Sequence, residues 1–241
     1  MIDTRLLGWV VQLGLVISAM VCGPGAGAVM ISPVLVDLSV QKPIVAVWVR
    51  NDSSKVMRFQ VETLNWQQQG QQDIYEPTQD LLVVPPLVDI AAGATQVLTV
   101  SWRPRAGMGQ GEHAYRLMIE DITGESDKRA GALELRFRHN LPVFAMPMVS
   151  ARFAANWSQC VAPAGQGCVR LDNAGNQRIR VHQLTLEGRG WTQLVRGGAT
   201  VLAGAWTQWF FDMAGHSIGP IHVRAKAEGM TLTAEIPPAL P

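Results

Sequence analysis

Residues Gln96–Trp102 read Gln-Val-Leu-Thr-Val-Ser-Trp, a stretch in which every second side chain from Leu98 onward is apolar. A period of two is typical of a β-strand with one buried face. Ile44–Arg50 (Ile-Val-Ala-Val-Trp-Val-Arg) is a second strand-like stretch, of β-branched character, and it ends at a turn cluster, residues 51–54. Segments of this kind continue to the end of the chain, and helical periodicity is hard to find. The sequence therefore predicts an all-β protein.

The strand-like segments fall into two groups separated by a proline-bracketed stretch, Pro142–Pro147. The first group has about seven segments in roughly 115 residues, the size of one immunoglobulin-like sandwich. Its members are Ile31–Val40, Ile44–Arg50, Val56–Trp66, Leu81–Val84, Gln96–Trp102, Ala114–Ile122 and Leu133–Phe144. We expect a first immunoglobulin-like domain over residues 29–147.

The second group repeats the same pattern of short strand-like segments separated by turns, over a slightly shorter length. Its segments are Ser150–Asn156, Val169–Leu171, Ile179–Leu186, Thr200–Leu202, Thr207–Phe211, Ile221–Lys226 and Thr231–Ile236. We expect the aromatic side chains of this half to fill its core; they are Trp191, Trp206, Trp209, Phe210 and Phe211. The prediction is a second, smaller immunoglobulin-like β-sandwich over residues 148–241.

The first 28 residues have the layout of a secretory signal peptide. Arg5 precedes an apolar run over residues 6–22, and a small-residue stretch ends at Ala28. An uncleaved anchor is one alternative, because about 17 apolar residues is the lower limit for a membrane span. A lipoprotein modified at Cys22 is another, which Val21 in front of it disfavours. We expect cleavage after residue 28 and export to the periplasm.

Removing residues 1–28 from the 241 leaves 213 residues and two cysteines, Cys160 and Cys168. An exported chain with one such pair is expected to form a disulfide. The five histidines (His113, His139, His182, His216 and His222) have no metal-ligand spacing, so we assign no metal. A formal net charge of +1 gives no electrostatic case for nucleic acid or an anionic membrane, which favours a protein partner.

No motif of an activated nucleophile, phosphate loop, dinucleotide site or metalloprotease is present. Glu112 beside His113, and Asp212 near His216, are acid and base pairs of a kind that occur by chance. The sequence does not predict an enzyme or a cofactor.

Leu133, Leu135 and Phe137 lie on one face of a strand whose other face carries charged residues. The simplest interpretation is that these three side chains fill the core of the first domain. The alternative is an edge strand that is lent to another protein that lacks a strand.

The order and spacing of several short motifs resemble the periplasmic pilus chaperones of the chaperone-usher pathway. In the first domain these motifs are Ile31-Ser32-Pro33, Val49-Arg50-Asn51-Asp52, Phe59-Gln60, Trp66-Gln67, Tyr75-Glu76-Pro77-Thr78, Pro85-Pro86, Gly93-x-x-Gln96, Glu112-x-x-Tyr115-Arg116-Leu117, Leu133-x-Leu135-x-Phe137 and Leu141-Pro142-Val143-Phe144. In the second domain Leu171-x-Asn173-x-Gly175-Asn176 is similar. No single motif is specific, but together they cover most of the chain.

The resemblance implies two immunoglobulin-like domains at an angle, with a cleft between them. It implies that the last strand of the first domain, with Leu133, Leu135 and Phe137, is inserted into a pilus subunit that lacks a strand. It further implies delivery of the subunit to an outer-membrane usher.

Two features depart from the best-known branch of that family. An arginine and a lysine that anchor the subunit's C-terminal carboxylate are replaced here by Leu35 and Pro142. A buried carboxylate still requires charge-assisted donors, and the candidates are Arg116, Arg138 and Arg136.

The second departure concerns an ion pair between the domains. Glu112 and Asp212 match the family's acidic positions, but Met146 occupies that of its arginine. Our hypothesis is that Arg116 or Arg138 compensates. In these two departures the chain resembles the divergent branch of the family, which serves archaic or spore-coat-U-like pili.

Two competing functions follow from the sequence. An envelope adhesin or binding module on the same fold predicts a satisfied sheet edge and no need for a subunit. A hydrolase predicts a convergent polar pocket. Whether the free chaperone caps itself as a homodimer is left open.

Overall fold

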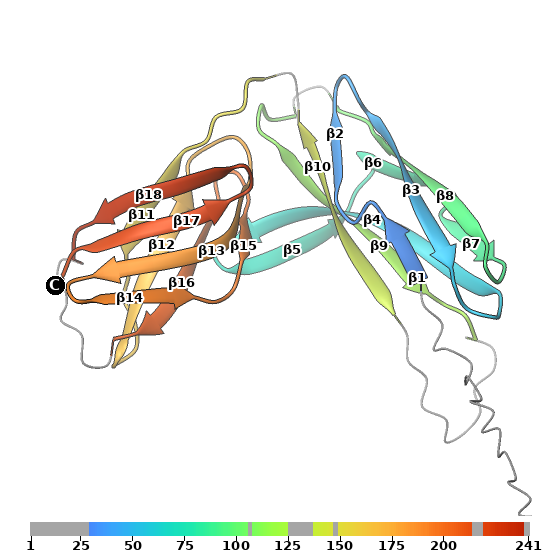
Figure 1. Ribbon diagram of the computed structural model, residues 1–241. Coiled ribbons are helices and arrows are strands. Elements are labelled where there is room, and N and C mark those ends of the chain that lie inside the picture. Colours follow the sequence, from blue (N-terminus) through green and yellow to red (C-terminus); the bar gives the residue numbers. More distant parts are fainter. Residues whose placement is uncertain (1–28, 106–107, 125–136, 147–148, 214–218, 239–241) are drawn as a thin grey trace, which may run out of the picture.

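The computed structural model describes residues 29–105, 108–124, 137–146, 149–213 and 219–238. Within these ranges all eighteen regular elements are β-strands, and none is a helix long and apolar enough to cross a membrane. The strands form two sandwiches that meet at an angle and enclose a concave side (Figure 1). This confirms the predicted all-β fold with two immunoglobulin-like domains.

The first domain consists of two sheets that face each other across one core. The first sheet has the order β1 (Val29–Ser32), β3 (Ile44–Asn51), β8 (Thr95–Trp102) and β6 (Leu81–Val84). The second has the order β2 (Val36–Ser39), β10 (Arg138–Met146), β9 (His113–Asp121), β4 (Met57–Gln69) and β5 (Gln72–Pro77), with β7 (Leu87–Ile90) also paired to β4. The core lies between the two sheets.

The alternation of Gln96–Trp102 has the predicted consequence for packing. Leu98 and Val100 are fully buried, and Trp102 is 3% exposed, whereas Val97 on the other face of β8 is 40% exposed. Each large apolar side chain buried in this way stabilises the folded state by about 1.5–3 kcal/mol relative to leaving it exposed to water. Neighbouring strands also bury one face, and the buried faces of the two sheets together form the core of the sandwich.

Three features of the first domain were not anticipated. The segment Ile31–Val40 is not one strand but two, because the chain passes from one sheet to the other between β1 and β2. β5 and β7 were not predicted either. β5 (Gln-Asp-Ile-Tyr-Glu-Pro) has almost no apolar alternation because it is an edge strand exposed along most of its length.

The second domain is also a two-sheet sandwich. Its smaller sheet has the order β11 (Ala155–Gln159), β12 (Gln166–Asn173) and β16 (Trp206–Asp212). Its larger sheet has the order β14 (Trp191–Val195), β13 (Ile179–Gly188), β17 (Ile221–Ala227) and β18 (Met230–Ile236), with β15 (Ala199–Val201) paired to β13.

The aromatic residues of the second domain divide between core and surface. Trp191, Trp209 and Phe211 are less than 10% exposed and pack in the core, as predicted. Phe210 is 43% exposed, because it points away from the core between its two buried neighbours on β16. Its assignment to the core was wrong, and Trp206 is only partly buried.

Each domain is pinned by one buried asparagine in an equivalent position. The Asn51 Nδ2 group donates to the main-chain oxygens of Lys55 and Ile90 at 2.7 and 2.9 Å. The Asn173 Nδ2 group donates in the same way to Gln177 and Val201 at 2.7 and 3.0 Å. In both domains the side chain closes a turn and ties it to a distant loop, and a buried amide is tolerated because its donors are satisfied.

The predicted disulfide is present and confirmed. Cys160 follows β11 and Cys168 lies in β12, with 5.0 Å between their Cα atoms. The main-chain N–H of Cys160 also donates to the Cys168 oxygen at 3.0 Å. The bridge therefore closes the loop between two paired strands.

The two domains share one apolar cluster where they meet. Trp66, Ala114 and Phe144 of the first domain are buried in the cluster that contains the core of the second domain. Leu35 is partly buried against the same cluster. Because apolar surface is removed from water across the junction, the angle between the domains is fixed by packing and not only by the linker.

Candidate functional site

The sheet face that carries the site is the outer face of β9 and its neighbours. Along β9, Tyr115 and Leu117 point into the first domain's core, so Ala114 and Arg116 point to the opposite face. Ala114 packs against the second domain. Arg116 lies two residues further along the strand, about 6.7 Å away, and is therefore at the edge of the domain junction.

Arg116 is held in an aromatic cage. Its guanidinium carbon lies 3.7 Å from the centre of the Trp66 ring and 5.8 Å from that of Tyr75. Trp66 and Tyr75 are cross-strand neighbours in the β4–β5 hairpin. Aromatic faces attract a cation and orient its flat guanidinium group.

The cage leaves hydrogen-bonding capacity on the cation. The Arg116 Nε atom is buried and has no hydrogen-bond partner among the described residues. A carboxylate is the natural partner for a guanidinium, since the two can form paired charge-assisted hydrogen bonds. The geometry is thus suited to binding a carboxylate from another molecule.

Tyr75 is fixed by neighbouring polar groups. Its hydroxyl donates to Asp73 Oδ2 at 3.1 Å. Partial burial raises the pKa of Tyr75 above its ordinary value, Arg116 acts in the opposite direction, and Asp73 raises it further. The hydroxyl therefore stays protonated near neutral pH and keeps its hydrogen bond to Asp73.

The first half of β10 has a free edge. Arg138–Pro142 pair with β9 on one side, but β2 pairs only with Val143–Met146 on the other. No other described strand covers that edge. An uncovered strand edge presents main-chain groups to which a strand of another protein can pair.

Of the predicted donor residues, Phe137 directly precedes β10 and is 55% exposed. It is on the same face of the chain as Leu141 and Val143, which are in the core. The side chains on this face are therefore buried in the core at Leu141 and Val143 and exposed to solvent at Phe137. Leu133, Leu135 and the anchor candidate Arg136 lie outside the described residues.

Arg138 is placed differently from Arg116. Its side chain is 47% exposed and is paired with Glu62 at 3.4 Å and Glu120 at 3.6 Å. Two carboxylates on the same sheet already occupy this cation, so it is less available than Arg116 to bind a third.

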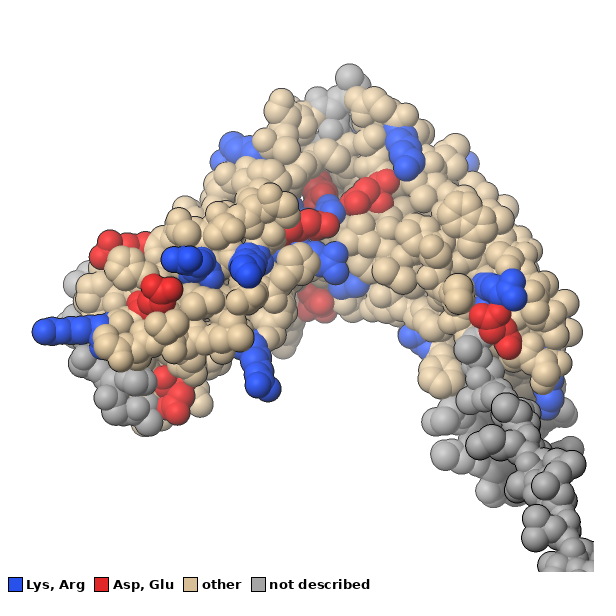
Figure 2. All heavy atoms as spheres, in the orientation of Figure 1, with Lys and Arg blue, Asp and Glu red and all other residues tan. Residues whose placement is uncertain are grey.

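The domains are joined by a cluster of charged residues at their junction, which Figure 2 shows as acidic and basic side chains gathered between the two lobes. Arg178, just before β13, donates to Glu112, just before β9, through its Nη1 atom and through its main-chain N–H at 2.9 Å. Its Nη2 atom donates to Asp37 at 2.9 Å, and its guanidinium lies 3.8 Å from the centre of the Phe144 ring. Burial raises the pKa of Glu112, while Arg178 lowers it.

The arginine of this junction is therefore neither Arg116 nor Arg138. The structure brings Glu112 to Arg178 of the second domain, and Asp37 is a second acidic partner. Sequence reasoning missed Arg178, because 66 residues separate it from Glu112 and no local pattern links the two positions.

Asp212 does not lie at the junction. β16 begins at Trp206, beside Asp172, and ends at Asp212, beside Gln166. A strand of this length spans about 20 Å, so Asp212 is at the end of the domain remote from Glu112. The structure does not bring these two predicted residues together.

A cavity of about 280 Å³ opens beside the charged cluster, between the two domains. It is lined by residues of both, among them Asp37, Glu112, Phe144, Phe153, Arg178 and Met230. Within the described ranges no group of three or more metal-ligating side chains converges.

Comparison with known proteins identifies a family with this architecture. The sequence profile of the pili and flagellar-assembly chaperones, PapD N-terminal domain, matches residues 28–150, just over half of the chain. Comparison with curated protein sequences gives no match.

Solved structures share the fold across both domains. The chaperone complex with a tip adhesion subunit from archaic Csu pili of Acinetobacter baumannii aligns at a TM-score of 0.63 and 19% identity, over 87% of this chain and 98% of that one. The class 5 fimbriae chaperone CfaA gives 0.61 and 17%, over 88% and 100%. The SafB chaperone, solved with the SafA pilin of Salmonella enterica, gives 0.60 and 16%, over 86% and 95%.

At these identities the structures show a common fold, and the profile match over residues 28–150 shows the family. This chain belongs to the PapD-like pili and flagellar-assembly chaperones.

Proposed function

We propose that this chain is a periplasmic chaperone that binds a pilus subunit lacking a strand, donates its own strand to it and delivers it to an outer-membrane usher. The single observation that carries the proposal is the free edge of β10 at Arg138–Pro142, with the exposed Phe137 at its start. Strand addition supplies main-chain hydrogen bonds, and the alternating apolar side chains fill the partner's groove. Leu133, Leu135 and Phe137 are the donor side chains.

Arg116 is the anchor for the subunit's C-terminal carboxylate in this proposal. Three properties support it over the other candidates: partial burial, the cage of Trp66 and Tyr75, and a buried Nε atom without a partner. Arg116 is also the cross-strand neighbour of Pro142, at the end of the free edge. A subunit strand that pairs with β10 would therefore reach the cage with its terminus.

The departures at Leu35 and Pro142 support a divergent branch of the family, of the kind that serves archaic pili. Leu35 packs against the shared apolar cluster, and Pro142 has no main-chain N–H and no charge. Neither side chain can bind the subunit's carboxylate, so in this proposal that role falls to Arg116 on β9.

Strand donation is tested by co-expressing the chain with a pilus subunit in the periplasm and measuring soluble subunit. We expect Leu135→Glu to abolish recovery of the complex, because a carboxylate cannot be buried unpaired in an apolar groove. Glu134→Gln is the control, since a strand that turned Leu135 into the partner's groove would turn residue 134 away from it. Subunit that stays soluble without this chain, or a complex that tolerates Leu135→Glu, contradicts strand donation.

The anchor is tested separately with Arg116→Lys, which keeps the charge but loses the flat guanidinium. We expect subunit binding to weaken by roughly 30-fold or more, since disrupting one partner of a buried, hydrogen-bonded charge pair costs about 2–5 kcal/mol. Arg138→Lys is the control and should weaken binding less than about threefold, as expected for an exposed ion pair. Equal effects of the two substitutions contradict the assignment.

A further inference from the structure

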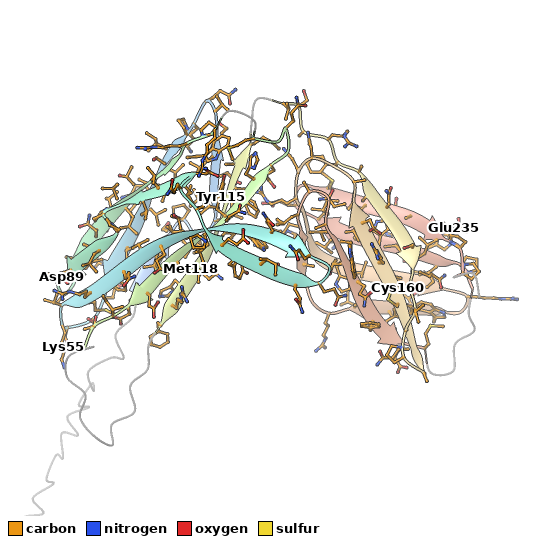
Figure 3. The ribbon with its side chains drawn as sticks, turned by 180° about the vertical axis from the view of Figure 1, so that it is seen from behind. Lys55, Asp89, Tyr115, Met118, Cys160 and Glu235 are labelled. Atoms are coloured by element: carbon orange, nitrogen blue, oxygen red, sulfur yellow. A yellow bond between two sulfur atoms is a disulfide. The ribbon has the colours of Figure 1, made fainter. Side chains whose placement is uncertain are left out.

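The β4–β5 hairpin connects the aromatic cage to the second domain. It reaches from the first domain across the junction in both views (Figures 1 and 3). Trp66 and Tyr75 form one cross-strand pair, and Gln68 and Asp73 form the next pair toward the tip on the same face. The hairpin therefore places the cage and its contact with the second domain on one surface.

Gln68 docks the hairpin on the second domain through its side-chain amide. Its Nε2 group donates to the Thr200 oxygen at 2.9 Å, and its Oε1 atom accepts from the main-chain N–H of Leu202 at 2.9 Å. The second Nε2 hydrogen is used as well, because Nε2 lies 3.0 Å from Asp73 Oδ1. This set of partners fits only an amide in this orientation, since reversing it would oppose two acceptors to the oxygen.

The contacts continue without a break to the cage. Asp73 accepts from Gln68 through Oδ1 and from the Tyr75 hydroxyl through Oδ2, at 3.0 and 3.1 Å. The Tyr75 ring then faces Arg116. A chain of hydrogen bonds thus runs from the main chain of the second domain to one wall of the cage.

The hairpin tip makes a second contact with that domain. Gly70, in the turn, has a φ of +62°, which favours glycine. A Cβ atom at this position would lie 3.5 Å from the Trp206 ring, and the Arg170 guanidinium carbon lies 4.0 Å from the centre of that ring. The tip therefore rests on a side chain that the second domain itself holds in place.

We propose that Gln68 and Asp73 are positioning residues that couple docking of the β4–β5 hairpin on the second domain to the geometry of the Arg116 cage. The inference rests on the proposed function of Arg116. The second domain, which donates no strand in this scheme, then contributes to subunit binding by holding Tyr75 against the anchor. Side chains bound through one chain of partners act as a unit, so loss of one is felt along the whole chain.

A tyrosine titration tests the coupling without any subunit. The chain contains two tyrosines, Tyr75 and Tyr115, so in a Tyr115→Phe background only Tyr75 ionises. Asp73 raises the pKa of Tyr75. We expect Gln68→Ala to release Asp73 and to lower the pKa measured from tyrosinate absorbance. Gln69→Ala, an exposed neighbour on the same hairpin, should leave it unchanged.

The second readout is capture of a co-expressed pilus subunit. We expect Gln68→Ala to weaken capture about tenfold, the effect of one net hydrogen bond, and Gln69→Ala to have no effect. Capture and Tyr75 titration that both match the unmodified chain in Gln68→Ala overturn the coupling. If Arg116→Ala also captures subunit normally, the anchor itself is wrong; if Arg116→Ala loses capture, only the coupling is.

Discussion

Arg178 of the second domain and Glu112 of the first are joined by a side-chain ion pair, and the main-chain N–H of Arg178 also donates to the Glu112 carboxylate at 2.9 Å. The Arg178 and Glu112 side chains are only 13% and 6% exposed. The main-chain N–H of Glu112 in turn donates to the Asn176 oxygen at 2.7 Å. The junction is therefore held by a nearly buried charge pair, and Glu112 also binds the backbone of the second domain at Arg178 and Asn176.

We predict that Glu112→Ala lowers the free energy of unfolding by about 2–3 kcal/mol. Removing one member of a buried pair leaves the other charge uncompensated, although Asp37 still contacts Arg178. Urea unfolding measures the loss. Asp37→Ala is the control, because that carboxylate is 60% exposed and should cost less than about 1 kcal/mol. Equal costs for the two substitutions would show that the Glu112 pair has no special weight.

We predict that Asn173→Ala destabilises the protein by about 2–4 kcal/mol. The substitution leaves the main-chain oxygens of Gln177, Val201 and Leu202 without their donor, at a cost of about 1–3 kcal/mol for each buried group that water does not reach. Thermal unfolding of the variant checks this. Asn156→Ala, at an exposed position on β11, should stay within about 0.5 kcal/mol of the unmodified chain.

We predict a loss of stability between pH 10 and 12 that depends on Tyr115. Burial raises the pKa of Tyr115 to about 12, against about 10 in the unfolded chain. In that window the folded state binds more protons than the unfolded state, so the free energy of unfolding falls as the pH rises.

The check is the urea midpoint at pH 9 and pH 11 for the unmodified chain and for Tyr115→Phe. The variant loses the hydrogen bond that Trp102 Nε1 donates to the Tyr115 hydroxyl at 3.2 Å, so it should be less stable at pH 9. Its further loss at pH 11 should be smaller. An identical drop in both proteins would mean that Tyr115 does not carry the effect.

We predict that Cys160→Ala with Cys168→Ala lowers stability by about 2–3 kcal/mol, the chain-entropy value for so short a loop. Subunit capture should not change, because the bridge lies at the end of β12 opposite Asn173, and the junction contact of Asn176 with Glu112 follows that far end. Urea unfolding and co-expression measure the two effects. A capture defect in a folded variant would implicate this end of the second domain in binding.

The parts of the fold that the sequence predicts are those with a local signal. β8 alternates apolar and polar residues from Leu98 onward, β3 begins with six apolar residues, and both strands were located to within one residue. β5 escaped prediction because its stability comes from pairing with β4 and not from burial of its own side chains.

The candidate site divides in the same way. Arg116 was singled out by its place in a motif, but the cage could not be predicted, because Trp66 lies beside it only through the register of β4 and β9. Arg178 has no motif at all, and its importance follows from the angle between the domains. Residues whose role depends on register or domain orientation become visible only in three dimensions.

Strand pairing itself is tested most directly by hydrogen exchange on the complex with a co-expressed pilus subunit. We predict that the main-chain N–H groups over residues 133–141 that do not already pair with β9, those of Arg138 and Asn140 among them, exchange in the free chain and become protected in the complex. The outer face of the opposite sheet, around Trp48, should show no change. Protection around Trp48 with none over residues 133–141 would contradict strand donation and favour a binding module that uses another surface.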